Sequence, residues 1–299
     1  WEVRGVGYTM EMARRVPGYE ACSRISPYLT YGVLSVREVY QRGMERKGDL
    51  LVKKQEGLAF DKRWNQAMKS FLGRLRWHCH FMQKLEDEPS IEWENFSPVY
   101  DGLREESWNE VFFEAWKEGR TGYPMVDACM RAVRATGYLN FRMRAMVMSF
   151  ASYHLWLHWR ETGLHLARMF TDYEPGIHWS QSQMQSGTTG INTVRVYSPR
   201  KQVEDQDAEG VFVKRWVPEL AGVPEKFLAE PHLMPEMEQQ FCGCVIGKDY
   251  PAPVVEHKVA YAEAQRRVRA VRVTQEARAE ADRVQERHGS RRRGTRTWR

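Results

Sequence analysis

The chain has 299 residues, 42% hydrophobic and 12% aromatic, enough for one large domain or two ordinary ones around a sizeable core. Its mostly apolar run at residues 145–157 is too short to cross a bilayer, and no secretory signal is visible, which argues against a membrane span. Five cysteines without framework spacing indicate free thiols in a reducing, intracellular compartment instead of a disulfide scaffold.

The formal net charge of +6 is unevenly distributed. Residues 266–299 carry 12 arginines, no lysine and four acidic residues, whereas the remainder is slightly acidic. The basic character therefore comes from the end of the chain, and composition indicates no cationic cleft in the body. We expect a body at residues 1–265 and an arginine-rich helix and tail at 266–299, with disorder from Arg291 onward.

The chain opens with a helical pattern at residues 1–18. It begins with Trp1 and not Met, which suggests a fragment or a processed chain, for example a plastid or mitochondrial product; a cytoplasmic protein is the alternative.

A loop at Cys22-Ser23-Arg24-Ile25-Ser26 precedes a helix that should begin near Pro27. Serine hydroxyls and the unpaired N–H groups of a helix start bind anions, so the loop suits a phosphate. An ordinary serine cap is the alternative.

Helical spacing of apolar residues predicts a helix from Trp64 to Leu85, which includes Phe71 and Trp77. The run Trp77-His78-Cys79-His80 contains metal-ligand residue types, but helical neighbours one and two apart do not share a face. Cys242-Gly-Cys244 lacks a second ligand pair. We therefore predict no metal site.

The central stretch, residues 119–220, organises the chain. Pro124 suits a first helical position and Gly137 suits a helix stop, so a helix is predicted between them. A second apolar helix is predicted from about Leu139 to Arg160, followed by a polar loop at 180–192. Helical periods without clean alternating strands predict an all-α fold.

This stretch resembles the FAD-binding domain of the photolyase and cryptochrome family. The matching segments are Gly-Arg-Thr-Gly-Tyr-Pro-Met-Val-Asp-Ala-Cys-Met-Arg (119–131), Thr-Gly-Tyr (136–138), Arg-Met-Arg (142–144), Trp-Arg (159–160) and Arg-Trp-Val-Pro-Glu-Leu (215–220). The resemblance covers roughly residues 19–265 and implies the family's helical fold. The family's amino-terminal α/β antenna domain is absent from these 299 residues: either the protein has lost it, or the chain begins after it.

The resemblance implies FAD as cofactor. It places the flavin pyrophosphate at Ser23, Ile25 and Ser26, where Cys22 replaces the usual threonine. The isoalloxazine would lie near four residues: Arg144, Asp172, Glu174 and His178. Arg144 would pair with Asp172, and a purely structural pair is the alternative. His178 stands where the family often has an asparagine; it could titrate near neutrality and donate a proton to the flavin, or simply fill space.

The resemblance also assigns Trp77 to the pocket for a damaged DNA base. The usual glutamate one turn earlier is Arg74, which cannot accept a hydrogen bond, and the residue after Trp77 is His78. We therefore expect lesion repair to be weakened. Arg195 is a candidate phosphate contact and Arg142 a second candidate nucleic-acid contact, each with a structural role as the alternative.

The family's tryptophan electron-transfer chain is incomplete here. Trp159 occupies the middle position, whereas Ser182 replaces the tryptophan nearest the flavin. Trp156 or Trp179 could substitute for it. We expect weak or rerouted photoreduction.

Two functions follow. The first is a blue-light flavoprotein in DNA repair or signalling, a photolyase-like lyase if it is active, with Trp77, Trp159 and His178 in its chemistry. The second is a non-catalytic structural or interaction subunit that keeps the fold and binds RNA, or joins a larger protein assembly, through its surface and basic tail.

Overall fold

A computed structural model describes residues 5–11 and 22–289 of the chain. The described residues are helical apart from loops, and their only β-type pairing is an isolated bridge between Ile246 and Tyr250. The all-α prediction is therefore confirmed. The predicted opening helix lies only partly within the described residues, and the arginine-rich end at residues 290–299 lies outside them.

The helices follow one another in this order: α1 (Tyr8–Glu11), α3 (Ser26–Thr30), α4 (Val36–Gln55), α5 (Arg63–Asp87), η1 (Pro89–Glu92), η2 (Pro98–Tyr100), η3 (Glu105–Ser107), α6 (Glu110–Glu118), α7 (Pro124–Thr136), α8 (Phe141–Ser149), η4 (Phe150–His154), α9 (Trp159–Met169), α10 (Pro175–Ser186), α11 (Pro199–Gln206), α12 (Val211–Trp216), η5 (Pro218–Leu220), α13 (Glu225–Leu228), η6 (Pro231–Leu233), α14 (Glu236–Cys242), α15 (His257–Arg272) and α16 (Gln275–His288).

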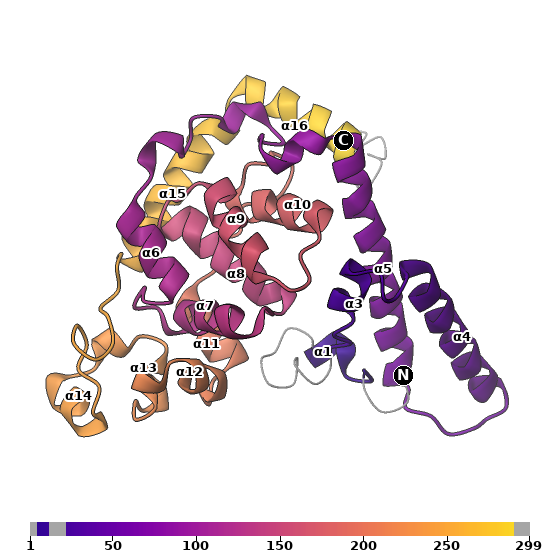
Figure 1. Cartoon of the computed structure of the whole chain (residues 1–299), viewed down its shortest axis with the longest axis horizontal. Coiled ribbons are helices and arrows are strands. Elements are labelled where there is room, and N and C mark those ends of the chain that lie inside the picture. The colour runs from indigo at the N-terminus through magenta and orange to yellow at the C-terminus, as the bar shows by residue number, and fades with distance from the viewer. Residues whose placement is uncertain (1–4, 12–21, 290–299) are drawn as a thin grey trace, which may run out of the picture.

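Helices α7 to α10 form the centre of the molecule, and α5 joins it to a projecting arm (Figure 1). The carboxyl-terminal part of α5 packs on α10, while its amino-terminal part pairs with α4 and α1 in the arm. Helices α11 and α12 pack on α7, and α15 packs on η4. The largest buried cluster follows the centre, with Trp116, Trp159 and Trp179 among its members.

The Gly-Arg-Thr-Gly-Tyr-Pro motif has a structural explanation. Buried Asp127 of α7 accepts hydrogen bonds from the Thr121 amide at 2.8 Å, the Thr121 hydroxyl at 2.6 Å and the Tyr250 hydroxyl at 2.5 Å. Gly122 has a φ of 78°, and a Cβ there would lie 2.5 Å from the Ala252 backbone. The turn therefore fastens residues 250–252 to the start of α7.

The prediction of a single long helix from about Leu139 to Arg160 was wrong. The chain instead forms α8, a π-helical turn η4, and a break at residues 155–158 before α9. Trp156 adopts a φ of 55° in this break. The buried guanidinium of Arg104 explains how the break is tolerated, since Nε donates to the Ser152 carbonyl at 3.0 Å and the ring of Trp156 stacks on it at 4.4 Å.

The end of the described chain also departs from the sequence-based expectation. The helix expected in the arginine-rich segment from residue 266 is divided at Val273–Thr274, where the Thr274 hydroxyl caps α16 by accepting from the Ala277 amide. Residue 265 lies inside α15, so the predicted division at 265/266 does not coincide with the end of a helix. It stays a prediction.

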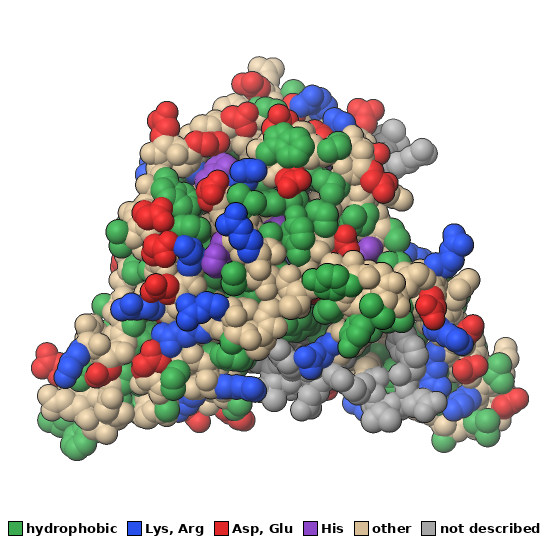
Figure 2. Space-filling model, in the orientation of Figure 1, with side chains coloured by type: hydrophobic (Ala, Val, Ile, Leu, Met, Phe, Trp, Pro, Cys, Tyr) green, Lys and Arg blue, Asp and Glu red, His purple; other side chains and the backbone are tan. Residues whose placement is uncertain are grey.

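Surface charge on the visible face is mixed, with Lys or Arg and Asp or Glu interspersed (Figure 2). Among the described residues no helix has both the length and the apolar character that crossing a membrane requires.

Candidate functional site

The predicted pairing of Arg144 with Asp172 is confirmed. Arg144 Nη2 donates to both carboxylate oxygens of Asp172, at 2.7 and 2.8 Å, and its Nε donates to the Leu139 carbonyl at 2.8 Å. The guanidinium also stacks on the ring of Phe170 at 4.0 Å. Asp172 is 7% exposed, so the pair is a charge-assisted contact at the edge of the core that joins α8 to the loop before α10.

His178, one turn into α10, lies beside this pair. Its Nε2 is 2.8 Å from the Gly163 carbonyl oxygen, which fixes Nε2 as the protonated nitrogen. Burial lowers the pKa of His178 to about 4. Of the two alternatives, filling space is favoured over titration near neutrality, because the ring is neutral at pH 7 and its Nε2 proton is donated to the Gly163 carbonyl of α9.

Glu174 stands immediately before α10 and contacts α5. Its Oε2 lies 3.6 Å from Nε2 of His78. The two side chains are mostly covered, so this contact helps position the part of α5 that carries Trp77 against α10.

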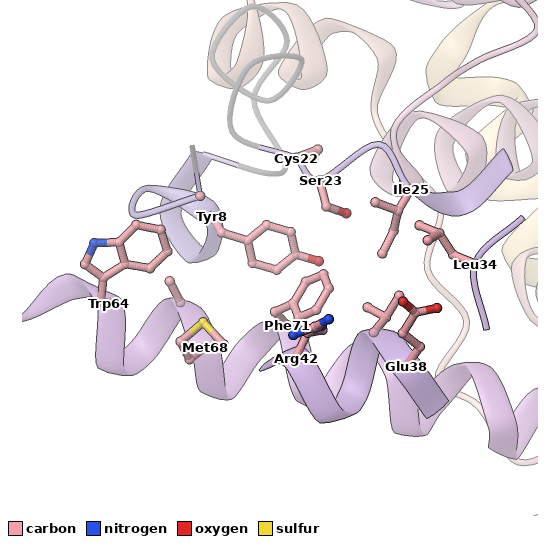
Figure 3. A pocket seen from close by; sticks show the side chains of 13 residues that line it. Tyr8, Cys22, Ser23, Ile25, Leu34, Glu38, Arg42, Trp64, Met68 and Phe71 are labelled. Atoms are coloured by element: carbon pink, nitrogen blue, oxygen red, sulfur yellow. The ribbon is translucent and has the colours of Figure 1, made fainter. Parts of the chain in front are cut away.

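The loop with Ser23, Ile25 and Ser26 borders a separate, mostly apolar cavity of about 380 Å³ (Figure 3). Ser23 and Ile25 face it, with Tyr8 and Phe71 across the space. Ser26 begins α3, and no side chain caps that helix within the described residues. The serine-cap alternative is thus not supported, which leaves the hydroxyls of this loop available to a ligand.

Tyr138 connects the loop to the Arg144 pair. The guanidinium of Arg24 lies 5.9 Å from the Tyr138 ring centroid, and that of Arg144 lies 5.7 Å from it. Arg24, Tyr138 and Arg144 thus form a cation–aromatic cluster, the Tyr138 cluster, with the serine loop on one side and the Arg144–Asp172 pair on the other. A separate contact joins Arg74 of α5 to Phe141 of α8, at 4.6 Å.

Arg74 stacks on Phe141 at the position where the resemblance expects an acidic side chain. A guanidinium over Phe141 can donate hydrogen bonds to a neighbouring group but cannot accept one. Trp77, three residues later, is 44% exposed and packs on His80 and Phe81, at 5.3 and 5.8 Å between ring centroids. Its exposed face is therefore open to a further ring.

Trp159 and Trp179 lie edge to face, 6.0 Å between centroids, in the interior. The Trp159 indole donates to Asn95 Oδ1 at 2.7 Å, and that of Trp179 donates to the Tyr173 hydroxyl at 3.0 Å. The Trp179 ring also lies edge to face with that of His178, at 4.9 Å between ring centroids. Of the two candidates for the missing aromatic position, Trp179 adjoins Trp159, whereas Trp156 stacks on Arg104 and Arg267.

The nucleic-acid candidates are less defined. Arg195 is exposed, and its carbonyl accepts from the Ser149 hydroxyl at 3.2 Å. The Arg142 guanidinium lies 5.9 Å from the Phe141 ring. Within the described residues no group of three or more His, Cys, Asp or Glu side chains is arranged to hold a metal ion, and all five cysteines are free thiols.

Sequence reasoning missed part of this site. Tyr138 and Phe170 were not singled out, because an aromatic residue in a helical protein is usually core. Tyr8 stands about two residues from the position at which the family often has a flavin-contacting tyrosine, so the sequence alone does not assign it to the site. The structure places Tyr8 in the cavity with Ser23 and Ile25.

Residues 71–270 match the family described as the FAD binding domain of DNA photolyase. The chain belongs to this family, so its cofactor is FAD.

Among curated relatives, the deoxyribodipyrimidine photo-lyase of Alkalihalophilus pseudofirmus is 30% identical over 251 residues, which cover 82% of this chain and 48% of that protein. The cryptochrome DASH of Natronomonas pharaonis is 32% identical over 248 residues, covering 82% and 49%. The chain thus spans about half the length of these relatives.

Solved structures of photolyases are also similar to this chain. A class III photolyase from Agrobacterium tumefaciens superposes with a TM-score of 0.77 at 28% identity, covering 90% of this chain and 53% of that one. A Sulfolobus tokodaii photolyase, described with two FAD molecules, gives 0.65 at 30% identity, covering 83% and 50%.

Proposed function

We propose that this FAD-binding chain works in a blue-light flavoprotein of the photolyase and cryptochrome type. The observation that carries the proposal is the Arg144–Asp172 pair, which the Tyr138 cluster connects to the Ser23–Ser26 loop. When bound, FAD supplies light absorption and one-electron chemistry; the protein supplies binding, orientation and electrostatics.

The residues fit such a group in kind. Ser23 and Ile25 line the cavity, where Ser23 offers a hydroxyl donor to a pyrophosphate and Ile25 an apolar contact. Ser26, the first residue of α3, is outside this lining and offers a second hydroxyl nearby. Asp172 and Glu174 offer carboxylate acceptors on the other side of the cluster. Arg144 offsets the charge of Asp172, while neutral His178 packs edge-on against Phe170 beside the pair.

The aromatic pair Trp179 and Trp159 is our candidate for the electron route. Position 182 is serine, but Trp179 lies one turn earlier on α10 and so faces the same side of that helix. A Cβ on Gly163 would contact both Trp179 and Ser182, at 2.8 and 3.5 Å, which places both side chains over the same part of α9.

DNA is the partner that we propose, with Trp77 as the ring that stacks on a base and with Arg142 and Arg195 at phosphates. Arg74 disfavours direct recognition of a lesion through an acceptor, so signalling or altered substrate choice is favoured over standard dimer repair. An intracellular, reducing compartment fits the five free thiols. The comparisons do not favour the interaction-subunit alternative.

The test is a visible absorption spectrum of the purified protein, in the dark and then under blue light with a thiol reductant. We expect flavin bands that bleach on illumination. Stable bands would reject the photochemistry and leave FAD binding intact. No bands after addition of FAD would reject the assignment of Arg144, Asp172 and the serine loop.

A further inference from the structure

A second cavity, of about 200 Å³, lies between α5, α10 and α16. It is separate from the cavity at Ser23, and Trp77 stands at its border. Helix α16 contributes Val284, Gln285 and His288 to the lining, opposite Ser180 and Met184 of α10. Its volume is below the roughly 300–1,000 Å³ of most ligand pockets, and α16 is one of the elements that limit it.

The interior of this cavity has unused hydrogen-bonding groups. Ser180 and His288 are each 3% exposed, and within the described residues neither Ser180 Oγ nor His288 Nδ1 has a hydrogen-bond partner. Lys84 borders the cavity, with its ammonium 5.3 and 5.7 Å from the ring centroids of Phe81 and Phe96. Because buried polar groups are normally satisfied, this lining suits a planar ring with a polar edge.

Few residues hold α16 in place. Of its residues only Ala277, Val284 and His288 are buried. Val284 packs with Ile91 and Phe96.

The end of α16 has a polar attachment to the end of α5. His288 forms a short contact with Glu88, and Arg287 reaches the Asp87 carbonyl at 2.9 Å and Glu88 at 3.3 Å. The His288 ring also packs on Phe96, at 5.0 Å between ring centroids. A helix held by two small buried apolar side chains, Ala277 and Val284, and by contacts at its last turn can separate from the body at lower cost than a helix of the core.

Helix α16 also lies beyond the part of the chain that matches the family, which ends at residue 270. The family match therefore does not account for a wall of this cavity that residues 284–289 provide.

We propose that α16 is a movable cover that controls entry of an unpaired nucleic-acid base into the cavity beside Trp77. With α16 seated, Val284 and His288 close the space to a ring-sized volume. With α16 released, Phe81 and Ser180 become accessible beside Trp77, which is already 44% exposed. The choice of a base as occupant rests on the proposed function; the movement of α16 does not.

The first experiment measures the movement without any nucleic acid. Ser180→Cys places a thiol in the cavity, and mass spectrometry of the peptide containing residue 180 follows its reaction with a maleimide. Adding Val284→Asp should accelerate this reaction about tenfold, because a buried carboxylate favours the released helix. Val259→Asp, the same change at an exposed position on α15, should leave the rate unchanged.

His288→Ala is a milder second variant, and circular dichroism checks that each protein is folded. Equal labelling rates in the Ser180→Cys protein and in its Val284→Asp and His288→Ala derivatives would overturn the proposal that α16 is a movable cover. Fast labelling of residue 180 in the Ser180→Cys protein itself would also overturn it.

The second experiment measures binding of a fluorescent oligothymidylate to the full chain without the Ser180 change. Val284→Asp should bind about tenfold more tightly than the parent and than Val259→Asp, since no binding energy is then used to displace α16. Faster labelling without tighter binding would overturn the control of base entry. Flavin content is measured in every sample, so loss of FAD, which would contradict the proposed function, is read separately from the labelling rate.

Discussion

Arg144 and Asp172 form a two-oxygen ion pair that closes the gap between α8 and the loop before α10. The guanidinium lies between this carboxylate and the Phe170 ring, which shields it from solvent. One contact thereby fixes the relative position of two segments that we propose to contact the flavin.

Replacing Asp172 with Asn should remove most bound FAD and lower the free energy of unfolding by about 2 kcal/mol, because Arg144 loses its charged partner. The flavin-to-protein absorbance ratio and urea denaturation measure the two effects. The control is Glu219→Gln, which weakens the Arg131–Glu219 pair at 2.9 Å. It should lower stability and keep FAD, and equal loss of FAD in both variants would contradict the assignment.

Ser23→Ala combined with Ser26→Ala should weaken FAD binding about tenfold, since two hydroxyl donors to the pyrophosphate are lost. Ser35→Ala is the matched control, because Ser35 caps α4 through the Glu38 amide at 3.0 Å. That change should cost about 1 kcal/mol of stability without altering FAD affinity. Titration of the apoprotein with FAD decides between the outcomes; unaltered affinity in the double variant would remove the loop from the site.

Trp179→Phe should slow flavin photoreduction about tenfold, as should Trp159→Phe, because each removes an indole from the pair and a tenfold change corresponds to about 1.4 kcal/mol in the barrier. Trp156→Phe should have no such effect, because Trp156 stacks on Arg104 and Arg267 instead. Bleaching of the flavin bands under blue light with a thiol reductant measures the rate. A slow Trp156→Phe protein beside a normal Trp179→Phe protein would reverse the assignment.

Gly163→Ala tests the same contact without removing an indole. The added methyl group would lie 2.8 Å from the Trp179 ring, which cannot retract like a flexible side chain. We expect a loss of about 1–3 kcal/mol in stability and slower photoreduction than in the parent. Gly48→Ala, where a Cβ meets open space on α4, is the control and should not lose stability. Thermal melting measures the stability of both variants. Equal melting temperatures would contradict the close contact between Gly163 and Trp179.

Acid should destabilise the protein through His154. Its Nε2 lies 2.8 Å from Nδ1 of His257, and burial lowers the pKa of His154 to about 3. The unfolded chain binds a proton below about pH 6.5, so this contribution is complete above that pH and is lost as the pH falls toward 3.

Protonation linked to His154 alone should lower the free energy of unfolding by about 2 kcal/mol between pH 7 and pH 5. His154→Gln should show a smaller difference between urea denaturation at the two pH values than the parent does. His232→Gln, at an exposed position, should behave like the parent. The same pH dependence in all three proteins would show that other groups cause the loss.

The sequence by itself determined the all-α fold, the start of α7 at Pro124, its end at Gly137, and the Arg144–Asp172 pairing. The fold and the bounds of α7 depend on local chemistry, such as the fixed φ of proline and the helical period. The pairing depends on the family pattern, in which both Arg144 and Asp172 are present. The family assignment rests on the same segments.

Only the tertiary structure decided the rest. The break after η4 depends on Arg104, which is distant in sequence and takes up the Ser152 carbonyl. The neutral state of His178 depends on its burial, and the choice of Trp179 over Trp156 depends on which ring adjoins Trp159. Burial and contacts between distant residues leave no periodic trace in the sequence, so they appear only when the helices are packed together.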